Sequence, residues 1–115
     1  MSNRHRTGAA VLKTSAAIFA ALGDETRLSL VTKLTGGEPQ SISTLTSATK
    51  LTRQGVTKHL RVLEEVGVVK SIHVGRETRF ALEPQPLADV RAYLDQVSRQ
   101  WDEALARLKS FVEQE

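Results

Sequence analysis

Five hydrogen-bonding side chains recur at helical spacing between residues 53 and 61. They are Arg53, Gln54, Thr57, Lys58 and Arg61. In the major groove of DNA, glutamine can pair with adenine, arginine or lysine with guanine, and the threonine methyl group can contact thymine. Cationic side chains also bind phosphates, which fix the position of a protein on the duplex. These residue types at this spacing therefore predict a surface that contacts DNA.

The stretch from Leu51 to Val69 predicts the amphipathic helix that must carry these side chains. Its apolar residues recur at about 3.6 residues per turn and form one buried stripe. They are Val56, Leu60, Leu63 and Val66. Thr52 is the expected N-cap, and Gly67 is the expected left-handed C-cap before a strand. Taken alone, such a helix is more often an ordinary surface helix, so its neighbours decide the interpretation.

The composition predicts one soluble domain. A chain of 115 residues with 40% hydrophobic and 25% charged residues can build one modest core. It has no apolar run long enough to cross a bilayer, so no membrane partner is expected. The absence of cysteine excludes a disulfide scaffold. No targeting segment is recognised, and the expected location is the cytoplasm.

Positive charge is concentrated before residue 83. Residues 1–82 hold twelve Lys and Arg against six Asp and Glu, whereas residues 83–115 hold four against seven. The first part therefore carries a net charge of +6 and the second −3. This asymmetry predicts a polyanion, double-stranded DNA, as the partner of the first part.

The residues before Leu51 predict the rest of a helix-turn-helix. Residues 1–14 are expected to form a flexible tail and residues 15–22 a first helix. Asp24 is the expected N-cap of a second helix. The buried stripe of that second helix is expected at Leu28, Val31 and Leu34. After a turn at residues 36–39, a short helix begins near Ser43 and leads into the amphipathic helix.

Two β-prone runs, residues 68–74 and 78–82, predict a hairpin after the amphipathic helix. Gly75, Arg76 and Glu77 separate them, and Gly75 can adopt the positive φ of a tight turn. The hairpin carries the basic residues Lys70, His73, Arg76 and Arg79. The predicted fold is mainly α with a small β-hairpin (α+β), a winged helix-turn-helix over residues 15–83.

Pro84 and Pro86 are expected to break the chain before a last helix from about Leu87 to Val112. Its apolar residues are Leu87, Val90, Leu94, Val97, Trp101, Leu105, Leu108 and Val112. A helix of this length spans roughly 40 Å, more than a small domain can cover, so the uncovered stripe predicts a partner helix from a second copy. The alternative is a helix folded back onto its own domain. Residues 84–115 are thus expected to form a dimerisation helix within the same compact domain.

The chain resembles the ArsR-type winged-helix transcriptional regulators over nearly its whole length. The resemblance is carried by IFAALGDETRLSLVTKL, SISTLTSATKLTRQGVTKHLRVLEEVGVV and the hairpin around VGRETRFAL. The ending RQWDEALARLKSFVEQ is similar to a subgroup with a Trp-containing last helix. The resemblance implies a homodimer joined through its first and last helices. It also implies repression of the protein's own promoter from an inverted-repeat operator, relieved by an inducer.

Two sets of site residues follow from the pattern and the resemblance. The DNA-binding set is Thr52, Arg53, Gln54, Thr57, Lys58, His59, Arg61, Arg76 and Arg79. The dimerisation set is Ile18, Phe19, Leu94, Val97, Trp101, Leu105 and Leu108. Arg27 can bind a phosphate, although a structural ion pair with a nearby carboxylate is the favoured interpretation. Gly55 permits close backbone approach or is simply a tolerated helix glycine.

No metal site and no cofactor are expected. The last helix contains Asp89, Asp95 and Asp102 but no histidine, and His5, His59 and His73 lie in the tail, the predicted DNA-contacting helix and the hairpin. Zinc and softer ions prefer thiolate or imidazole ligands. Two alternatives then remain: an unknown small-molecule inducer, or no effector at all. A small molecule could bind where the first and last helices meet, near Phe19, Tyr93, Trp101 and Phe111. Packing of these aromatics in the dimer core is the favoured interpretation.

Two other functional classes compete with a DNA-binding regulator. A winged-helix domain used only for protein contacts would use the last helix for docking, but the donors at residues 53–61 and the basic hairpin speak against it. An enzyme is the weakest hypothesis, because no glycine-rich phosphate loop, metal-ligand cluster or activated nucleophile is recognisable.

Overall fold

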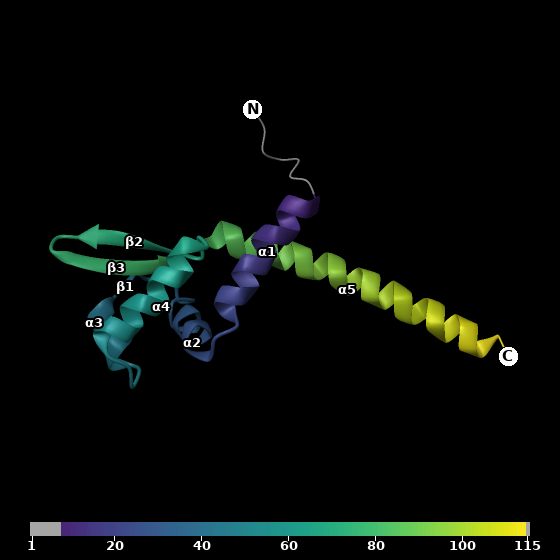
Figure 1. The fold of residues 1–115 in the computed structure, drawn as a ribbon, viewed down its shortest axis with the longest axis horizontal. Coiled ribbons are helices and arrows are strands. Elements are labelled where there is room, and N and C mark those ends of the chain that lie inside the picture. The colour runs from purple at the N-terminus through teal and green to yellow at the C-terminus, as the bar shows by residue number, and fades with distance from the viewer. Residues whose placement is uncertain (1–7, 115) are drawn as a thin grey trace, which may run out of the picture.

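The computed structural model describes residues 8–114 and is built from five helices and three short strands within that range (Figure 1). The helices are α1 (Gly8–Leu22), α2 (Glu25–Lys33), α3 (Ile42–Ser47), α4 (Arg53–Glu65) and α5 (Pro84–Glu113). The strands are β1 (Gln40–Ser41), β2 (Val69–Val74) and β3 (Glu77–Leu82). The predicted fold class is confirmed: α3 and α4 form a helix-turn-helix, and β2 and β3 form the hairpin beside it.

The sheet contains a strand that the sequence did not predict. Its order is β1-β3-β2, with both pairs antiparallel. Strand β1 has only two residues and pairs Gln40 with Phe80. A two-residue strand is too short to show an alternating pattern in the sequence, whereas the six-residue strands of the hairpin are long enough to show one.

Two helix boundaries differ from the predictions. Helix α1 begins at Gly8, so residues 8–14 are helical and not part of a tail; residues 1–7 lie outside the described residues. Helix α5 begins at Pro84, three residues earlier than expected, and its prolines lie in the first turn. Proline is tolerated there because the first-turn N–H groups have no helical acceptor.

Side-chain caps and left-handed glycines fix the other boundaries. Asp24, Ser41 and Thr52 cap α2, α3 and α4, each accepting a hydrogen bond of 3.1 Å from the backbone N–H three residues later. Because Ser41 is the N-cap, α3 begins at Ile42, one residue before the start predicted near Ser43. Gly67 and Gly75 have φ of +82° and +63°, as the predicted C-cap and hairpin turn require.

One hydrophobic core joins the helices and the hairpin. Its largest side chains with less than 2% exposure are Ile18, Leu30, Leu34, Leu45, Val56, Leu60, Leu63 and Val68. Two predictions are corrected here. Leu28 is 50% exposed and Leu30 takes its place in the buried stripe of α2. Ile18, expected at the dimer contact, is 1% exposed and belongs to the core of its own chain.

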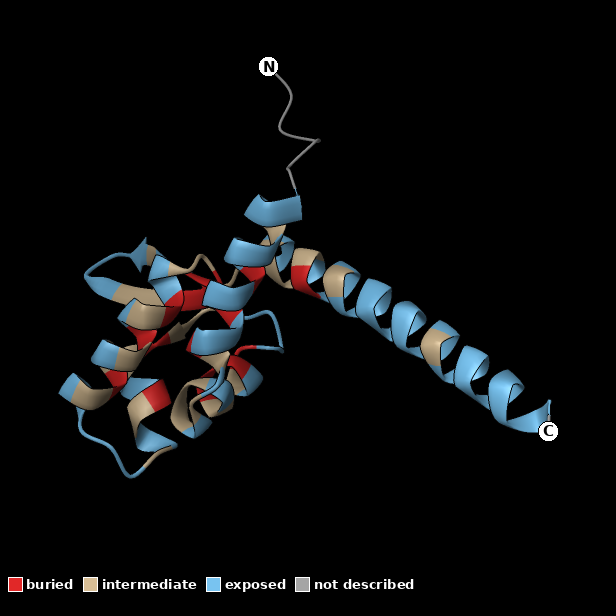
Figure 2. Ribbon diagram, turned by 45° about the vertical axis from the view of Figure 1, so that its right-hand side comes forward, coloured by how far each residue is buried: buried red, intermediate tan, exposed pale blue. Residues whose placement is uncertain are grey.

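Helix α5 leaves the body of the molecule after its first turns (Figures 1 and 2). Its only buried residue in the described range is Val90. The molecule is consequently elongated, with extents of 68 × 41 × 21 Å. The prediction that residues 84–115 belong to the compact domain therefore holds only for the start of α5, and α5 does not fold back onto the domain. Among residues 8–114, none of the helices combines the length and apolar character that a membrane crossing requires.

Candidate nucleic-acid interface

The polar face of α4 is largely exposed. Val56, Leu60 and Leu63 are fully buried and fix the orientation of the helix on the core. Around the opposite side lies a shallow hollow, which we call the α4 hollow. It is lined by Thr52, Arg53, Gln54, Gly55, Thr57, Lys58 and Arg61. Six of the nine residues predicted to bind DNA are thus brought together.

The α4 hollow is positively charged and rich in donors that are free to bind. Its lining contains Arg53, Lys58 and Arg61 and no carboxylate. Among the described residues, the side chains of Gln54, Lys58 and Arg61 make no hydrogen bond or ion pair, and all three residues are exposed. Such a surface favours a polyanion that presents hydrogen-bond acceptors.

Two residues of the hollow also hold the local structure. Arg53 donates from Nη1 to Ser43 Oγ at 2.7 Å, which links the start of α4 to α3. Thr57 donates its hydroxyl to the carbonyl of Arg53 at 2.7 Å. Since that hydroxyl is occupied, the methyl group is the part of Thr57 most suited to an outside contact.

Gly55 is not required by the packing of the protein. A Cβ at this position would lie 3.4 Å from Thr52 Oγ1 and 3.7 Å from the Leu51 Cβ, close to ordinary van der Waals separation. Its φ is not positive, so the backbone does not demand glycine either. The packing within the protein therefore gives no reason for a glycine here. The hypothesis that Gly55 allows DNA to approach the backbone closely remains open.

The hairpin contributes one free cation next to α4. Arg76 lies in the exposed turn between β2 and β3, and it lines a second hollow together with Arg53, Ser43 and Thr78. Arg76 makes no ion pair or hydrogen bond within residues 8–114. Arg79 instead pairs with Glu77, with 2.7 Å between Nε and Oε1.

His59 does not join the α4 hollow. Its Nδ1 lies 3.4 Å from Arg27 Nη1 and 3.8 Å from Asp24 Oδ2, so the ring faces the start of α2. The helical spacing explains this, because His59 follows Lys58 and borders the buried stripe. The hydrogen bond that the Arg27 backbone N–H donates to Asp24 lowers the pKa of that carboxyl, and the charge of Arg27 adds to this effect.

Arg27 has a structural role that the sequence did not reveal. Its Nε donates to the carbonyl of Ala21 at 2.5 Å and its Nη2 to that of Ala20 at 3.4 Å. The guanidinium therefore caps the carbonyls at the end of α1 instead of forming the expected ion pair. A bond from a side chain to a backbone of another helix leaves no spacing signal in the sequence.

The predicted dimerisation residues other than Ile18 remain accessible. Exposure is 36% for Phe19, 48% for Leu94, 39% for Val97, 67% for Trp101, 52% for Leu105 and 58% for Leu108. Of the four aromatics considered for a small molecule, the structure pairs Phe19 with Tyr93, at 6.3 Å between ring centroids. Trp101 and Phe111 lie farther along α5 and are exposed. Within residues 8–114, no three His, Cys, Asp or Glu residues are grouped to hold a metal ion; His5 lies outside that range.

Comparison with known proteins identifies a matching domain and two similar transcriptional regulators. Residues 22–72 match the model of a helix-turn-helix domain. The chain is 32% identical over 97 residues to the HTH-type transcriptional regulator Rv2034 of Mycobacterium tuberculosis, covering 84% of this chain and 87% of that protein. It is 36% identical over 80 residues to the HTH-type transcriptional regulator YuzN of Bacillus subtilis, covering 64% of this chain and 87% of that protein.

Solved structures agree with these relatives. An ArsR-like transcriptional regulator from Rhodococcus sp. RHA1 matches with a TM-score of 0.78 and 35% identity, over 89% of this chain and 95% of that one. A possible transcriptional regulator for arsenical resistance matches with a TM-score of 0.66 and 34% identity, over 82% and 94%. The fold and its exposed α4 thus define a DNA-binding transcriptional regulator. The chain belongs to the ArsR-type winged helix-turn-helix family, which is one of regulators and not of enzymes.

Proposed function

We propose that the protein is an autoregulatory repressor that binds an inverted-repeat operator as a homodimer. The observation that carries this proposal is the α4 hollow, with three cations, a glutamine and a threonine on one exposed helix face. A helix of this size fits the major groove of B-DNA, and its first residues lie nearest the bases. Each copy would place one α4 in one half of the operator.

Within this proposal the contacts divide between bases and phosphates. Arg53, Gln54, Thr57 and Lys58, which lie in the first two turns of α4, are assigned to base edges. Arg61 and Arg76 are assigned to phosphates, because Arg61 lies one turn later and Arg76 is in the turn of the hairpin.

The other three residues of the predicted DNA-binding set are less available to contact DNA. Arg79 can reach a phosphate only by giving up its pair with Glu77. Thr52 already uses its hydroxyl oxygen as the N-cap of α4. His59 faces Asp24 and Arg27, so we assign it to the support of α4.

The homodimer is proposed from the apolar surface of α5. Leu94, Trp101, Leu105 and Leu108 are each close to half exposed or more, and they repeat at steps of three, four and seven residues along one helix. An apolar stripe this long is stabilised when a second helix covers it. The homodimeric winged helix-turn-helix domain Mb0332 from Mycobacterium bovis has the same fold, with a TM-score of 0.63.

The proposal extends to regulation and location. Repression of its own promoter, relieved by a small-molecule inducer, is the mode that the family resemblance implies. The relatives Rv2034 and YuzN are bacterial transcriptional regulators, and a bacterial regulator of this kind acts in the cytoplasm, where the chromosome lies.

Footprinting on the DNA upstream of the protein's own gene tests the proposal. We expect two symmetric protected half-sites about one helical turn apart, roughly 34–36 Å. Sedimentation of the free protein should give a dimer, and affinity should fall steeply between low and moderate salt. Leu105→Asp, which puts a charge on the α5 stripe, should give a folded monomer with weak operator binding. Protection of one unpaired site by a monomer would contradict the proposal.

A further inference from the structure

Arg27 connects helices that lie far apart in the sequence. It belongs to the first turn of α2, and its Nε and Nη2 donate to the carbonyls of Ala21 and Ala20 in the last turn of α1. Its Nη1 lies 3.4 Å from Nδ1 of His59, which is 32 residues later in the chain and belongs to α4. One side chain thus joins α1 to α4. We call Ala21, Arg27 and His59 the Arg27 bridge.

The chemistry of the two side chains fixes the direction of the bond between Arg27 and His59. A guanidinium group has only donors, so Nδ1 of His59 is the acceptor. A neutral imidazole that accepts at Nδ1 carries its proton on Nε2. The carboxylate of Asp24 lies 3.8 Å from the same Nδ1, which is too far for a hydrogen bond. Among the described residues, Arg27 is therefore the hydrogen-bond partner of the His59 ring.

The Arg27 bridge adds a directional contact to the packing of α4. Val56, Leu60 and Leu63 bury the apolar face of the helix. Hydrophobic contacts have no preferred direction, whereas a hydrogen bond requires alignment of donor and acceptor. The guanidinium is itself held by two carbonyls of α1. His59 is thereby bound to a donor that α1 holds in place, and its own ring lies outside the α4 hollow.

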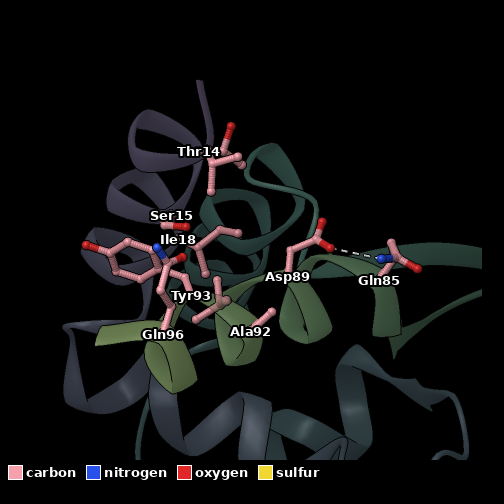
Figure 3. Close-up of a pocket in the computed structure, with 10 residues that line it drawn as sticks. Thr14, Ser15, Ile18, Gln85, Asp89, Ala92, Tyr93 and Gln96 are labelled. Atoms are coloured by element: carbon pink, nitrogen blue, oxygen red, sulfur yellow. Dashed lines mark hydrogen bonds between the residues drawn. The ribbon is translucent and has the colours of Figure 1, made fainter. Parts of the chain in front are cut away.

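The position of α4 relative to α1 matters when two copies bind one operator. Residues of α1 and of the start of α5 alone line one groove (Figure 3), so the two helices form a joint surface. In the homodimer that the family resemblance implies, these two helices meet the second copy. The contacts of α4 with α1 then help to set the separation of the two α4 helices, which must match the spacing of the half-sites.

We propose that Arg27 and His59 are positioning residues for operator binding. The bond between them holds α4 at the separation that two half-sites require, without contact between His59 and DNA. This role rests on the proposed function, since it serves the binding of a homodimer to an inverted repeat. Loss of the bond should weaken binding to the complete operator and leave binding to a single half-site nearly unchanged.

Three substitutions of His59 separate the bond to Arg27 from a direct contact with DNA. His59→Asn keeps an acceptor at the δ position, His59→Gln moves the amide to the ε position, and His59→Phe keeps a ring without hydrogen-bonding groups. We expect His59→Phe and His59→Gln to weaken binding to the complete operator by about threefold to tenfold, the effect of one lost hydrogen bond, and His59→Asn to bind like the original protein.

Fluorescence anisotropy with labelled DNA of one or two half-sites measures these affinities. Unchanged binding by His59→Phe would overturn the proposal. Rescue by His59→Gln in place of His59→Asn would also overturn it, because the contact would then be made from the ε position. An equal loss on the complete operator and on a single half-site would do the same.

Arg27→Lys tests the other end of the bond. Lysine keeps the charge, but one ammonium group cannot reproduce the guanidinium fork that holds the α1 carbonyls and His59. It should weaken operator binding at least as much as His59→Phe, and the double variant should bind no more weakly than Arg27→Lys alone, because both changes remove the same bond. Independent losses that multiply would contradict this. Urea unfolding followed by circular dichroism confirms that each variant is folded.

The DNA-free protein gives a readout that does not depend on the proposed function. At mildly alkaline pH, where histidine is neutral, ¹⁵N NMR of the His59 ring should show the proton on Nε2, and Arg27→Lys should shift the Nδ1 signal. A proton on Nδ1, or a signal that Arg27→Lys leaves unchanged, would overturn this role alone. If the original protein binds two half-sites no more tightly than one, the proposed function and this role fail together.

Discussion

Helices α4 and α5 are both amphipathic, but they use their two faces in opposite ways. Helix α4 spans 13 residues, fully buries Val56, Leu60 and Leu63 on its apolar face, and exposes a polar face in which several side chains have no partner among the described residues. Helix α5 spans 30 residues, yet Val90 is its only buried residue in the described range. An amphipathic pattern thus identifies an apolar face, while the surrounding fold decides whether that face or the opposite one is left to bind a partner.

The difference in burial predicts that Leu60 of α4 and Leu108 of α5 contribute differently to the free energy of unfolding. Leu60 of α4 is 0% exposed, and Leu60→Ala should lower the free energy of unfolding by about 2–5 kcal/mol, since it leaves a cavity in the core. Urea unfolding followed by circular dichroism at low protein concentration measures this loss.

Leu108→Ala is the matched change on α5, where the side chain is 58% exposed. It should leave unfolding at low concentration nearly unchanged and weaken only the concentration-dependent association. Equal destabilisation by both variants at low concentration would show that α5 packs on its own chain, and the contrast between the two helices would be lost.

The polar face of α4 predicts the next largest effects. Arg53→Ala and Lys58→Ala should each weaken operator binding by about 1–3 kcal/mol, because each removes a side chain that we propose to contact a base. Fluorescence anisotropy with labelled operator measures the affinities. Lys33→Ala, at the end of α2 and outside the α4 hollow, is the control and should bind normally. Full footprint protection by the Arg53/Lys58 double variant would remove α4 from the interface.

Gly55 separates stability from binding at one position. Gly55→Ala should raise the free energy of unfolding by up to ~1 kcal/mol, because alanine favours a helix and the fold has room for its Cβ. The same methyl group should hinder approach of the backbone to DNA and lower operator affinity. Paired thermal unfolding and anisotropy measurements test this, and unchanged affinity would make Gly55 merely a tolerated helix glycine.

The smallest expected effect concerns pH. The pKa of Asp24 lies below its ordinary value of 3.8, mainly because the Arg27 backbone N–H donates to the carboxylate. The charged form therefore stabilises the fold above that ordinary value, and this contribution disappears as the pH falls through the lowered pKa. We expect Asp24→Asn, which retains a capping oxygen, to be slightly less stable than the original protein at neutral pH and equal to it in acid. The urea unfolding midpoints of the two proteins should be measured from neutral to acid pH. A difference between the midpoints that stays the same at every pH would contradict this prediction.

The sequence predicted the residues of the α4 hollow better than it predicted the contacts that hold α4 against α1 and α2. The spacing of Arg53, Gln54, Thr57, Lys58 and Arg61 placed them on one face, and the structure brings them together in one hollow. His59 borders the buried stripe, and its ring lies near Asp24 and Arg27 outside that hollow, so its predicted contact with DNA stays a prediction. The contacts of Asp24, Arg27 and His59 join α1, α2 and α4, and contacts between distant segments leave no periodic pattern.

The sequence by itself determined the elements whose causes are local. Thr52 and Asp24 as caps, Gly67 and Gly75 as left-handed residues, and the stripe of α4 all follow from a few neighbouring residues. Only the tertiary structure decided which apolar faces are covered: it buried Ile18 and Leu30, exposed Leu28 and left α5 bare beyond its first turns. It also joined Ala21 and His59 through the side chain of Arg27. The physical reason is that helical periodicity defines a face, whereas burial depends on which distant segment packs against it.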